Sequence, residues 1–136
     1  MKNARELRII FLVVFFSFIL VKGYLKDDIL ENDPTLALQV FVLSYPNFCE
    51  AVLGSFVLVG IGLVINKRFI PKSKQVKNQL IYTWAIVLAA VYVILQEFKI
   101  HNIGGDNVYD PYDVLFSVIG IGVAYISIHK FQPYIG

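Results

Sequence analysis

The chain has 136 residues, of which 57% are hydrophobic and 16% are charged, and its formal net charge is +2. A soluble domain usually has about 45–50% apolar and about 25% charged residues, so this composition excludes an ordinary soluble domain. Long apolar runs with short connections fill the chain, which leaves no room for a separate soluble catalytic domain.

Four apolar runs predict four transmembrane helices, and therefore an all-α, polytopic membrane protein with a single membrane domain over residues 1–136. The first run follows basic residues but lacks the small-residue pattern of a signal-peptide cleavage site, which favours a retained helix. The second run can begin at Pro46, since proline is acceptable in a first helical turn. The helices are predicted at about residues 7–25, 46–66, 79–98 and 112–130.

The segment 29–45 lies between the first two predicted helices, and its conformation is left open by the sequence. Residues 35–44 are apolar but too few to cross a bilayer, which requires about 20 residues. They can lie flat on the outer leaflet, enter the membrane as a re-entrant piece, or extend the second helix across a kink at Pro46. An outer-face helix or a helical extension is favoured.

Charged residues between the apolar runs are sorted by sign. Short loops rich in Lys and Arg stay cytoplasmic because they resist translocation. The sequence therefore predicts a multi-pass protein of the cell membrane with both termini and the 66–79 loop in the cytoplasm. The basic residues are Lys2, Arg5, Arg8, Lys67, Arg68, Lys72, Lys74, Lys77 and Lys130, and the acidic segments on the other side include Asp27, Asp28, Glu31 and Asp33.

The same charge distribution restricts the partners of the chain. A protein that is basic on one side and acidic on the other is not expected to bind nucleic acid. Membrane lipids are the expected partners. The basic 66–79 loop is predicted to rest on anionic lipid headgroups, at about 1 kcal/mol for each residue near the surface. A homo-oligomer is left open.

Polar residues at the predicted outer helix ends share one membrane depth. A spacing of three places Asn47 with Glu50, and Asp110 with Asp113, on a common helix face. Intramembrane ionisable residues are often functional, so a shared polar site is predicted, against the simpler interpretation of helix caps and solvated ends. The candidate ligand-binding residues are Asn47, Glu50, Gln96, Glu97, Asp110 and Asp113.

Glu97 is the most informative of these candidates, because a carboxylate is disfavoured at a helix C-terminus. It is expected either to be protonated or to have a cationic partner. His101 in the next loop would need carboxylates from other helices to complete a metal site. The single cysteine, Cys49, excludes internal disulfides and cysteine-based metal sites. No metal, cofactor or catalytic residue is predicted.

Small residues indicate where the helices contact each other. Alanine and glycine let helix backbones approach closely, which drives association in lipid. The residues expected at helix contacts are Gly54, Gly60, Gly62, Ala85, Ala89, Gly120 and Ala124.

Two motifs of the second half carry a resemblance. Residues 93–98 read Val-Ile-Leu-Gln-Glu-Phe, and residues 109–122 contain Asp-Pro-Tyr-Asp followed by an apolar run with glycines. With Pro46-Asn47-Phe48, these motifs resemble the VanZ-like membrane proteins, in which a Glu/Gln pair closes one helix and Asp-x-x-Asp opens the next. The resemblance spans roughly residues 45–126. It selects Asn47, Gln96, Glu97, Asp110, Asp113 and Gly120.

The resemblance implies a small bacterial envelope protein, and the named member of the family is associated with resistance to a glycopeptide antibiotic. The chain departs from the family at Val108-Tyr109, where Arg or Thr-Phe is common, and at Ser117, where Asn is frequent. Both departures concern the identity of the ligand.

The leading functional hypothesis is a non-enzymatic, VanZ-like protein that binds a lipid, a cationic amphiphile or a cell-wall component at an acidic extracytoplasmic mouth. A proton- or cation-coupled transporter or channel component is the first alternative, with Glu50 and Glu97 as carriers. An intramembrane enzyme with Glu97 and Asp113 as acid and base is the second, although no nucleophile accompanies them. A structural subunit of a membrane complex is the third.

Overall fold

The computed structural model describes residues 2–32, 35–97 and 111–134 of the chain. Within these ranges the regular structure is entirely helical, which confirms the predicted all-α fold. The helices are α1 (Lys2–Leu20), α2 (Lys26–Glu31), α3 (Leu36–Val64), α4 (Asn78–Glu97) and α5 (Pro111–Phe131), with π-helical turns at Val21–Leu25 and Ile65–Phe69 and a 3-10 turn at Lys72–Lys74.

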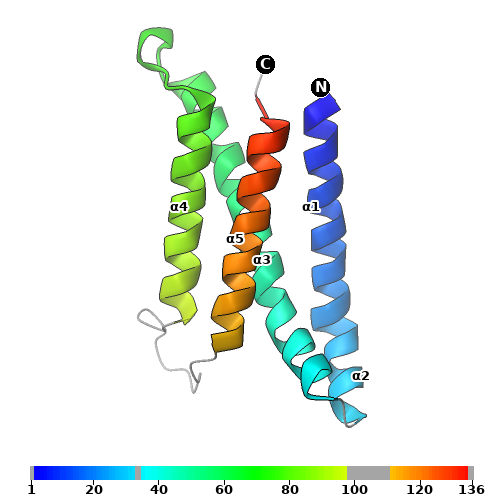
Figure 1. The fold of residues 1–136 in the computed structure, drawn as a ribbon. Helices are drawn as coiled ribbons and strands as arrows, with labels where there is room; N and C mark the ends of the chain where they lie inside the picture. The colour runs from blue at the N-terminus through cyan, green and yellow to red at the C-terminus, as the bar shows by residue number, and fades with distance from the viewer. Residues whose placement is uncertain (1, 33–34, 98–110, 135–136) are drawn as a thin grey trace.

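Helix α3 is the centre of the arrangement. It packs against α1, α4 and α5, and its contact with α5 is the most extensive in the molecule. Figure 1 shows α5 in front, between α4 and α1, with α3 passing obliquely behind it. Both ends of the chain and the turn between α3 and α4 lie at one end of the bundle (Figure 1).

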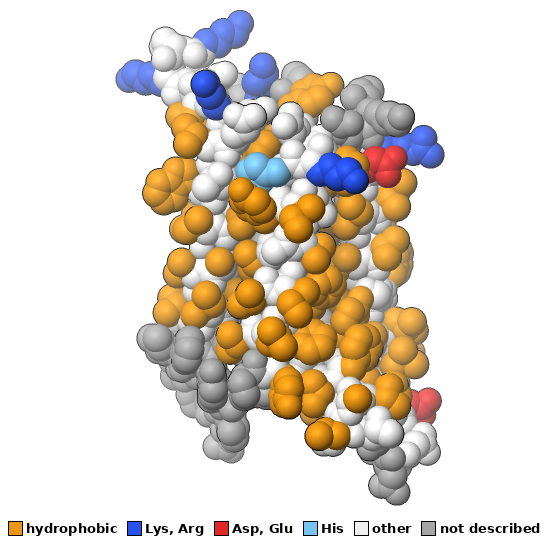
Figure 2. Space-filling view, in the orientation of Figure 1, with side chains coloured by type: hydrophobic (Ala, Val, Ile, Leu, Met, Phe, Trp, Pro, Cys, Tyr) orange, Lys and Arg blue, Asp and Glu red, His pale blue; other side chains and the backbone are white. Residues whose placement is uncertain are grey.

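Within the described residues, four helical stretches are long and apolar enough to cross a membrane, as the sequence predicts. Large apolar side chains cover the face seen in Figure 2, and Lys and Arg gather toward the end that carries the termini. An apolar surface of this extent suits contact with lipid rather than water. The stretches are Arg5–Glu31, Leu36–Phe69, Asn78–Gln96 and Tyr112–Phe131.

We call the end of the bundle that carries both termini the basic end. The other end, which holds the turn from α1 into α2 and the beginning of α3, is called the opposite end. The basic end begins with Lys2 of α1, and the basic residues there whose side chains are described are Arg5, Arg8, Lys67, Arg68, Lys72, Lys74, Lys77 and Lys130.

Helix α3 begins at Leu36 and continues through Pro46, whereas the sequence places the start of this helix near Pro46. Of the conformations left open for residues 35–44, the structure has the helical extension. Proline is tolerated inside transmembrane helices because neighbouring groups can satisfy the backbone around it. The extension is held by packing, since Val42 and Ser44 are almost completely buried. The Thr35 side chain caps its start by accepting the Leu38 N–H at 3.4 Å.

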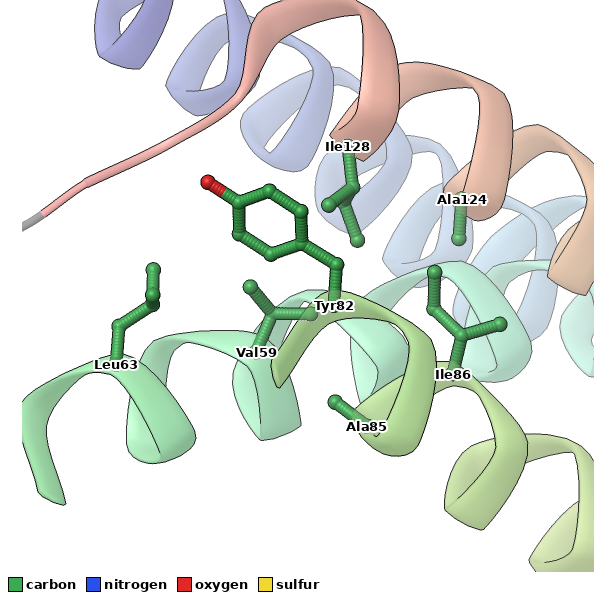
Figure 3. Packing of buried hydrophobic residues seen from close by; sticks show 7 residues of the cluster. All are labelled: Val59, Leu63, Tyr82, Ala85, Ile86, Ala124 and Ile128. Atoms are coloured by element: carbon green, nitrogen blue, oxygen red, sulfur yellow. The ribbon is translucent and has the colours of Figure 1, made fainter. Parts of the chain in front are cut away.

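The main core joins α3, α4 and α5 toward the basic end. Figure 3 shows Tyr82 reaching from α4 toward Ile128 of α5, with Val59 of α3 nearby. The ring of Tyr82 is buried, and its hydroxyl donates a hydrogen bond to the carbonyl oxygen of Pro133. This bond ties the segment after α5 back to α4.

Two glycines allow close helix contacts. A Cβ atom on Gly120 would lie 2.6 Å from the Phe48 carbonyl oxygen, and one on Gly62 would lie 2.7 Å from Cγ2 of Ile81. The predicted packing role is therefore confirmed for these two residues. At Gly54 and Gly60 an added Cβ would meet nothing within 4 Å, so the prediction is wrong there. The predicted Ala85, Ala89 and Ala124 are all buried.

The side chain of Asn66 stabilises the turn between α3 and α4 through two hydrogen bonds to the backbone of Val76. The Asn66 amide donates to the Val76 carbonyl oxygen at 2.9 Å and accepts the Val76 N–H at 3.1 Å. The Gln75 amide donates to the carbonyl oxygen of Ile70 at 3.0 Å. These bonds hold the exposed Lys and Arg side chains of the turn on an ordered backbone.

Candidate functional site: a groove between α1, α3 and α4

A groove of about 690 Å³ lies between α1, α3 and α4. Its volume is within the range of about 300–1,000 Å³ that is usual for small-molecule sites. Gly54 contributes to the space, because no side chain projects from α3 at this position. The lining is mostly apolar and consists of Phe15, Phe18, Glu50, Ala51, Leu53, Gly54, Val57, Leu58, Ala89, Tyr92, Val93 and Gln96.

Glu50 and Gln96, the carboxylate and the amide of this lining, lie toward the opposite end of the bundle. Gln96 is about 27 Å along α4 from Asn78, and Glu50 is about 21 Å along α3 from its last residue, Val64, at 1.5 Å per residue. The hydrocarbon core of a bilayer is about 30 Å thick. The polar end of the groove therefore lies toward one end of the apolar stretch of α3 and α4, and its apolar walls extend toward the middle of that stretch.

A lysine that the sequence analysis did not select completes the polar end. Lys22 Nζ is 3.9 Å from Glu50 Oε1, and it lies 5.1 Å from the ring centroid of Phe18. Phe18 and Glu50 both line the groove. The mouth of the groove thus carries a cation beside an anion, whereas the candidate residues predicted from the sequence are carboxylates and amides only. Both side chains are accessible, with exposed fractions of 57% for Lys22 and 37% for Glu50.

The local backbone explains why Lys22 reaches this place. It lies in the π-helical turn Val21–Leu25, where an extra residue per turn changes the direction of the following side chains. Val21 in the same turn is buried, while Lys22 is exposed. The only sequence signal was a basic residue just before an acidic segment, which also fits a lysine that simply extends toward the headgroups.

The candidate residues do not all belong to this groove. Glu50 and Gln96 line it together, whereas Asp113 accepts a hydrogen bond from Ser44 Oγ at 2.8 Å, between α3 and α5. Asn47 is half-buried on α3 and is not part of the groove lining. Glu97 is the last residue of α4, but its side chain, Asp110 and the loop histidine His101 lie outside what the structure describes.

The Ser44–Asp113 bond is expected to stabilise the contact of α3 with α5. Ser44 is completely buried, so Ser44→Ala removes the donor and leaves a carboxylate oxygen with one partner fewer. We expect a loss of about 1 kcal/mol in the free energy of unfolding, as for other hydrogen bonds between membrane helices. Unfolding by SDS in mixed micelles would measure it. Ser73→Ala, at an exposed position of the 3-10 turn, is the control, and equal stability of both variants would contradict the assignment.

A second polar contact joins α1 to α3. Ser17 Oγ donates to the Val14 carbonyl oxygen at 2.8 Å and lies 2.9 Å from Tyr45 Oη, within hydrogen-bonding distance. Cys49 is fully buried, and its sulfur lies 4.0 Å from Ser17 Oγ. Hydrogen bonds between membrane helices stabilise their association, so this cluster holds α1 in place beside the groove.

The groups at the groove mouth can bind a polar headgroup through ion pairs and hydrogen bonds. A carboxylate accepts, an ammonium donates, and an amide does both. Among the described residues, no group of three or more His, Cys, Asp or Glu side chains is arranged to hold a metal ion. The site supports recognition of a ligand by charge and shape.

Comparisons of the chain with models of protein families, with curated proteins and with solved structures found no match. The resemblance of residues 93–98 and 109–122 to the VanZ-like proteins therefore stays a prediction.

Proposed function

We propose that this chain is a VanZ-like, four-helix protein of the bacterial cell membrane that binds a membrane lipid in the groove between α1, α3 and α4. The basic end faces the cytoplasm, and the mouth of the groove with Lys22, Glu50 and Gln96 lies at the extracytoplasmic surface. The protein holds its ligand without chemical change.

The observation that carries this proposal is the division of the groove into a polar end and apolar walls. Glu50 and Gln96 line one end, and aromatic and aliphatic side chains line the remainder. Lipids have the same division between headgroup and hydrocarbon chain. Phe15 and Tyr92 line the groove and are also exposed on the surface of the bundle, so a lipid can enter sideways from the bilayer.

The charge distribution supports the proposed orientation and a second contact with lipid. Lys67, Arg68 and Lys72 are exposed on a turn that Asn66 fixes through its paired bonds to Val76. Each basic residue near an anionic leaflet contributes about 1 kcal/mol to the interaction with headgroups. A fixed turn loses less conformational entropy on binding than a flexible one. The turn therefore suits the anionic inner surface of a bacterial membrane.

Filling the groove tests the proposed function. Gly54→Phe adds an aromatic side chain at a position that lines the groove together with Glu50, and its Cβ meets nothing within 4 Å. We expect lipid retention to fall about tenfold, because the ring occupies the volume of the hydrocarbon chain. Native mass spectrometry of protein released from nanodiscs would measure the bound fraction.

Gly122→Phe is the matched control. Gly122 lies on α5, an added Cβ there also meets nothing within 4 Å, and the residue does not line the groove. This variant should retain lipid as the parent does. Equal retention by Gly54→Phe and Gly122→Phe would reject the groove as the lipid site.

A further inference from the structure

We propose that the groove selects a zwitterionic phospholipid, whose headgroup carries both an ammonium and a phosphate, over anionic and cationic amphiphiles. This inference rests on the proposed function and adds the class of headgroup. Lys22 binds the phosphate, Glu50 binds the ammonium, and one hydrocarbon chain lies along the apolar walls.

Charge complementarity is the first argument. Glu50 belongs to the groove lining, and the Lys22 ammonium lies beside both Glu50 and the groove residue Phe18. The mouth therefore presents one positive and one negative group side by side. A headgroup with the same two charges can pair with both of them, and its own two charges are separated by only a few bonds.

The Lys22–Glu50 pair is weak enough to open for such a ligand. Its 3.9 Å separation is longer than the distance of about 2.7–2.9 Å in a direct charge-assisted hydrogen bond. Both side chains are more than a third exposed. Exposed pairs of this kind contribute little to stability, so a ligand that inserts between them loses little by separating them.

The same pair disfavours headgroups with a single charge. A cationic amphiphile that pairs with Glu50 has the Lys22 ammonium as a close neighbour of like charge. An anionic lipid that pairs with Lys22 has the Glu50 carboxylate beside it in the same way. Juxtaposed like charges reduce affinity and set specificity between partners. The cationic amphiphile that the sequence analysis included among the ligands is therefore the less suitable one.

The apolar part of the groove runs in the direction of a hydrocarbon chain and can contact the part of the chain nearest the headgroup. From Glu50 to Leu58 along α3 is about 12 Å, measured toward the membrane centre. The walls along this path come from Phe15 on α1, Val57 on α3 and Val93 on α4. A phospholipid whose headgroup is at the Lys22–Glu50 pair therefore has its chain parallel to those of the surrounding bilayer.

The test is a competition between three lipids with the same chains. The protein is reconstituted into nanodiscs that contain phosphatidylethanolamine, phosphatidylglycerol and a trimethylammonium lipid in equal amounts, and the bound lipid is identified by native mass spectrometry. We expect the parent to retain phosphatidylethanolamine about fivefold over each of the others. Glu50→Gln should shift retention toward phosphatidylglycerol, and Lys22→Gln should shift it toward the cationic lipid.

The controls separate this inference from the proposed function. Lys26→Gln and Glu31→Gln make the same charge changes on α2 at residues that do not line the groove and have no ion pair with Glu50 in the described part of the structure, and they should leave the preference of the parent unchanged. If the parent shows no preference, or if Lys22→Gln and Glu50→Gln leave it unchanged while Gly54→Phe still lowers retention, the headgroup assignment is wrong and groove binding stands. If Gly54→Phe has no effect, both proposals fail.

Discussion

Gly120→Val is expected to destabilise the helix bundle by about 3 kcal/mol. An added Cβ on Gly120 would lie 2.6 Å from the Phe48 carbonyl oxygen and 2.9 Å from the Ala51 Cβ. The first of these atoms belongs to the backbone of α3, so no side-chain rotation can relieve the overlap. The helices must separate along their most extensive contact. Unfolding by SDS in mixed micelles, followed by the fluorescence of Trp84, the single tryptophan, would measure the loss.

Gly122→Val on the same helix is the control for this experiment. An added Cβ there meets nothing within 4 Å, while the change in helix propensity is the same. The two variants should therefore differ by nearly the whole cost of the overlap. If Gly120→Val and Gly122→Val unfold alike, α3 and α5 do not approach each other as closely as the structure indicates.

Hydropathy was sufficient to predict the four spanning helices, because the bilayer requires long apolar helical stretches. The start of α3 could not be predicted from local rules. Pro46 favours a helix beginning, but burial of Val42 and Ser44 continues the helix through it. Tertiary packing thus sets the start of α3 at Leu36, whereas the preference of proline for a first helical turn placed it at Pro46.

The residues that form the candidate site were harder to predict from the sequence than the helices that are long and apolar enough to span a membrane. Glu50 and Asp113 were both expected at one polar mouth, but only Glu50 lines the groove, and Asp113 contacts Ser44 between α3 and α5. In a membrane helix the residues that face lipid and those that face other helices are both apolar, so periodicity does not reveal rotation about the helix axis. Lys22 was missed for a related reason, since its direction depends on the π-helical turn that contains it.

The groove and the charge distribution together connect the architecture with the proposed function. The ion pair at the mouth can serve as a headgroup site only if that end of the bundle lies at a membrane surface, and the proposed orientation makes this the outer surface. The orientation of the protein in the membrane therefore decides which leaflet supplies the bound lipid. It can be tested separately from lipid binding, with probes placed at the two ends of the bundle.

Cysteine labelling in intact cells is expected to distinguish the two ends almost completely. In a Cys49→Ser background, Asn32→Cys at the opposite end should react with a membrane-impermeant maleimide, and Ser73→Cys at the basic end should react only after permeabilisation. Cys49 is the single native cysteine and is fully buried, so its replacement removes background labelling. The reverse pattern would show that the basic end is extracytoplasmic, and would place the groove mouth at the inner surface.

Neutralising the basic turn should weaken this orientation, since Lys and Arg near the ends of transmembrane helices resist translocation. Replacing Lys67, Arg68, Lys72, Lys74 and Lys77 with glutamine is expected to make a substantial fraction of Ser73→Cys reactive in intact cells. The control replaces Asp27 and Asp28 with asparagine, which should have little effect because acidic residues contribute weakly to orientation. If the acidic control changes the labelling more than the basic variant does, the sorting of charges along the chain does not determine its topology. The orientation would then have to come from the packing of the helices.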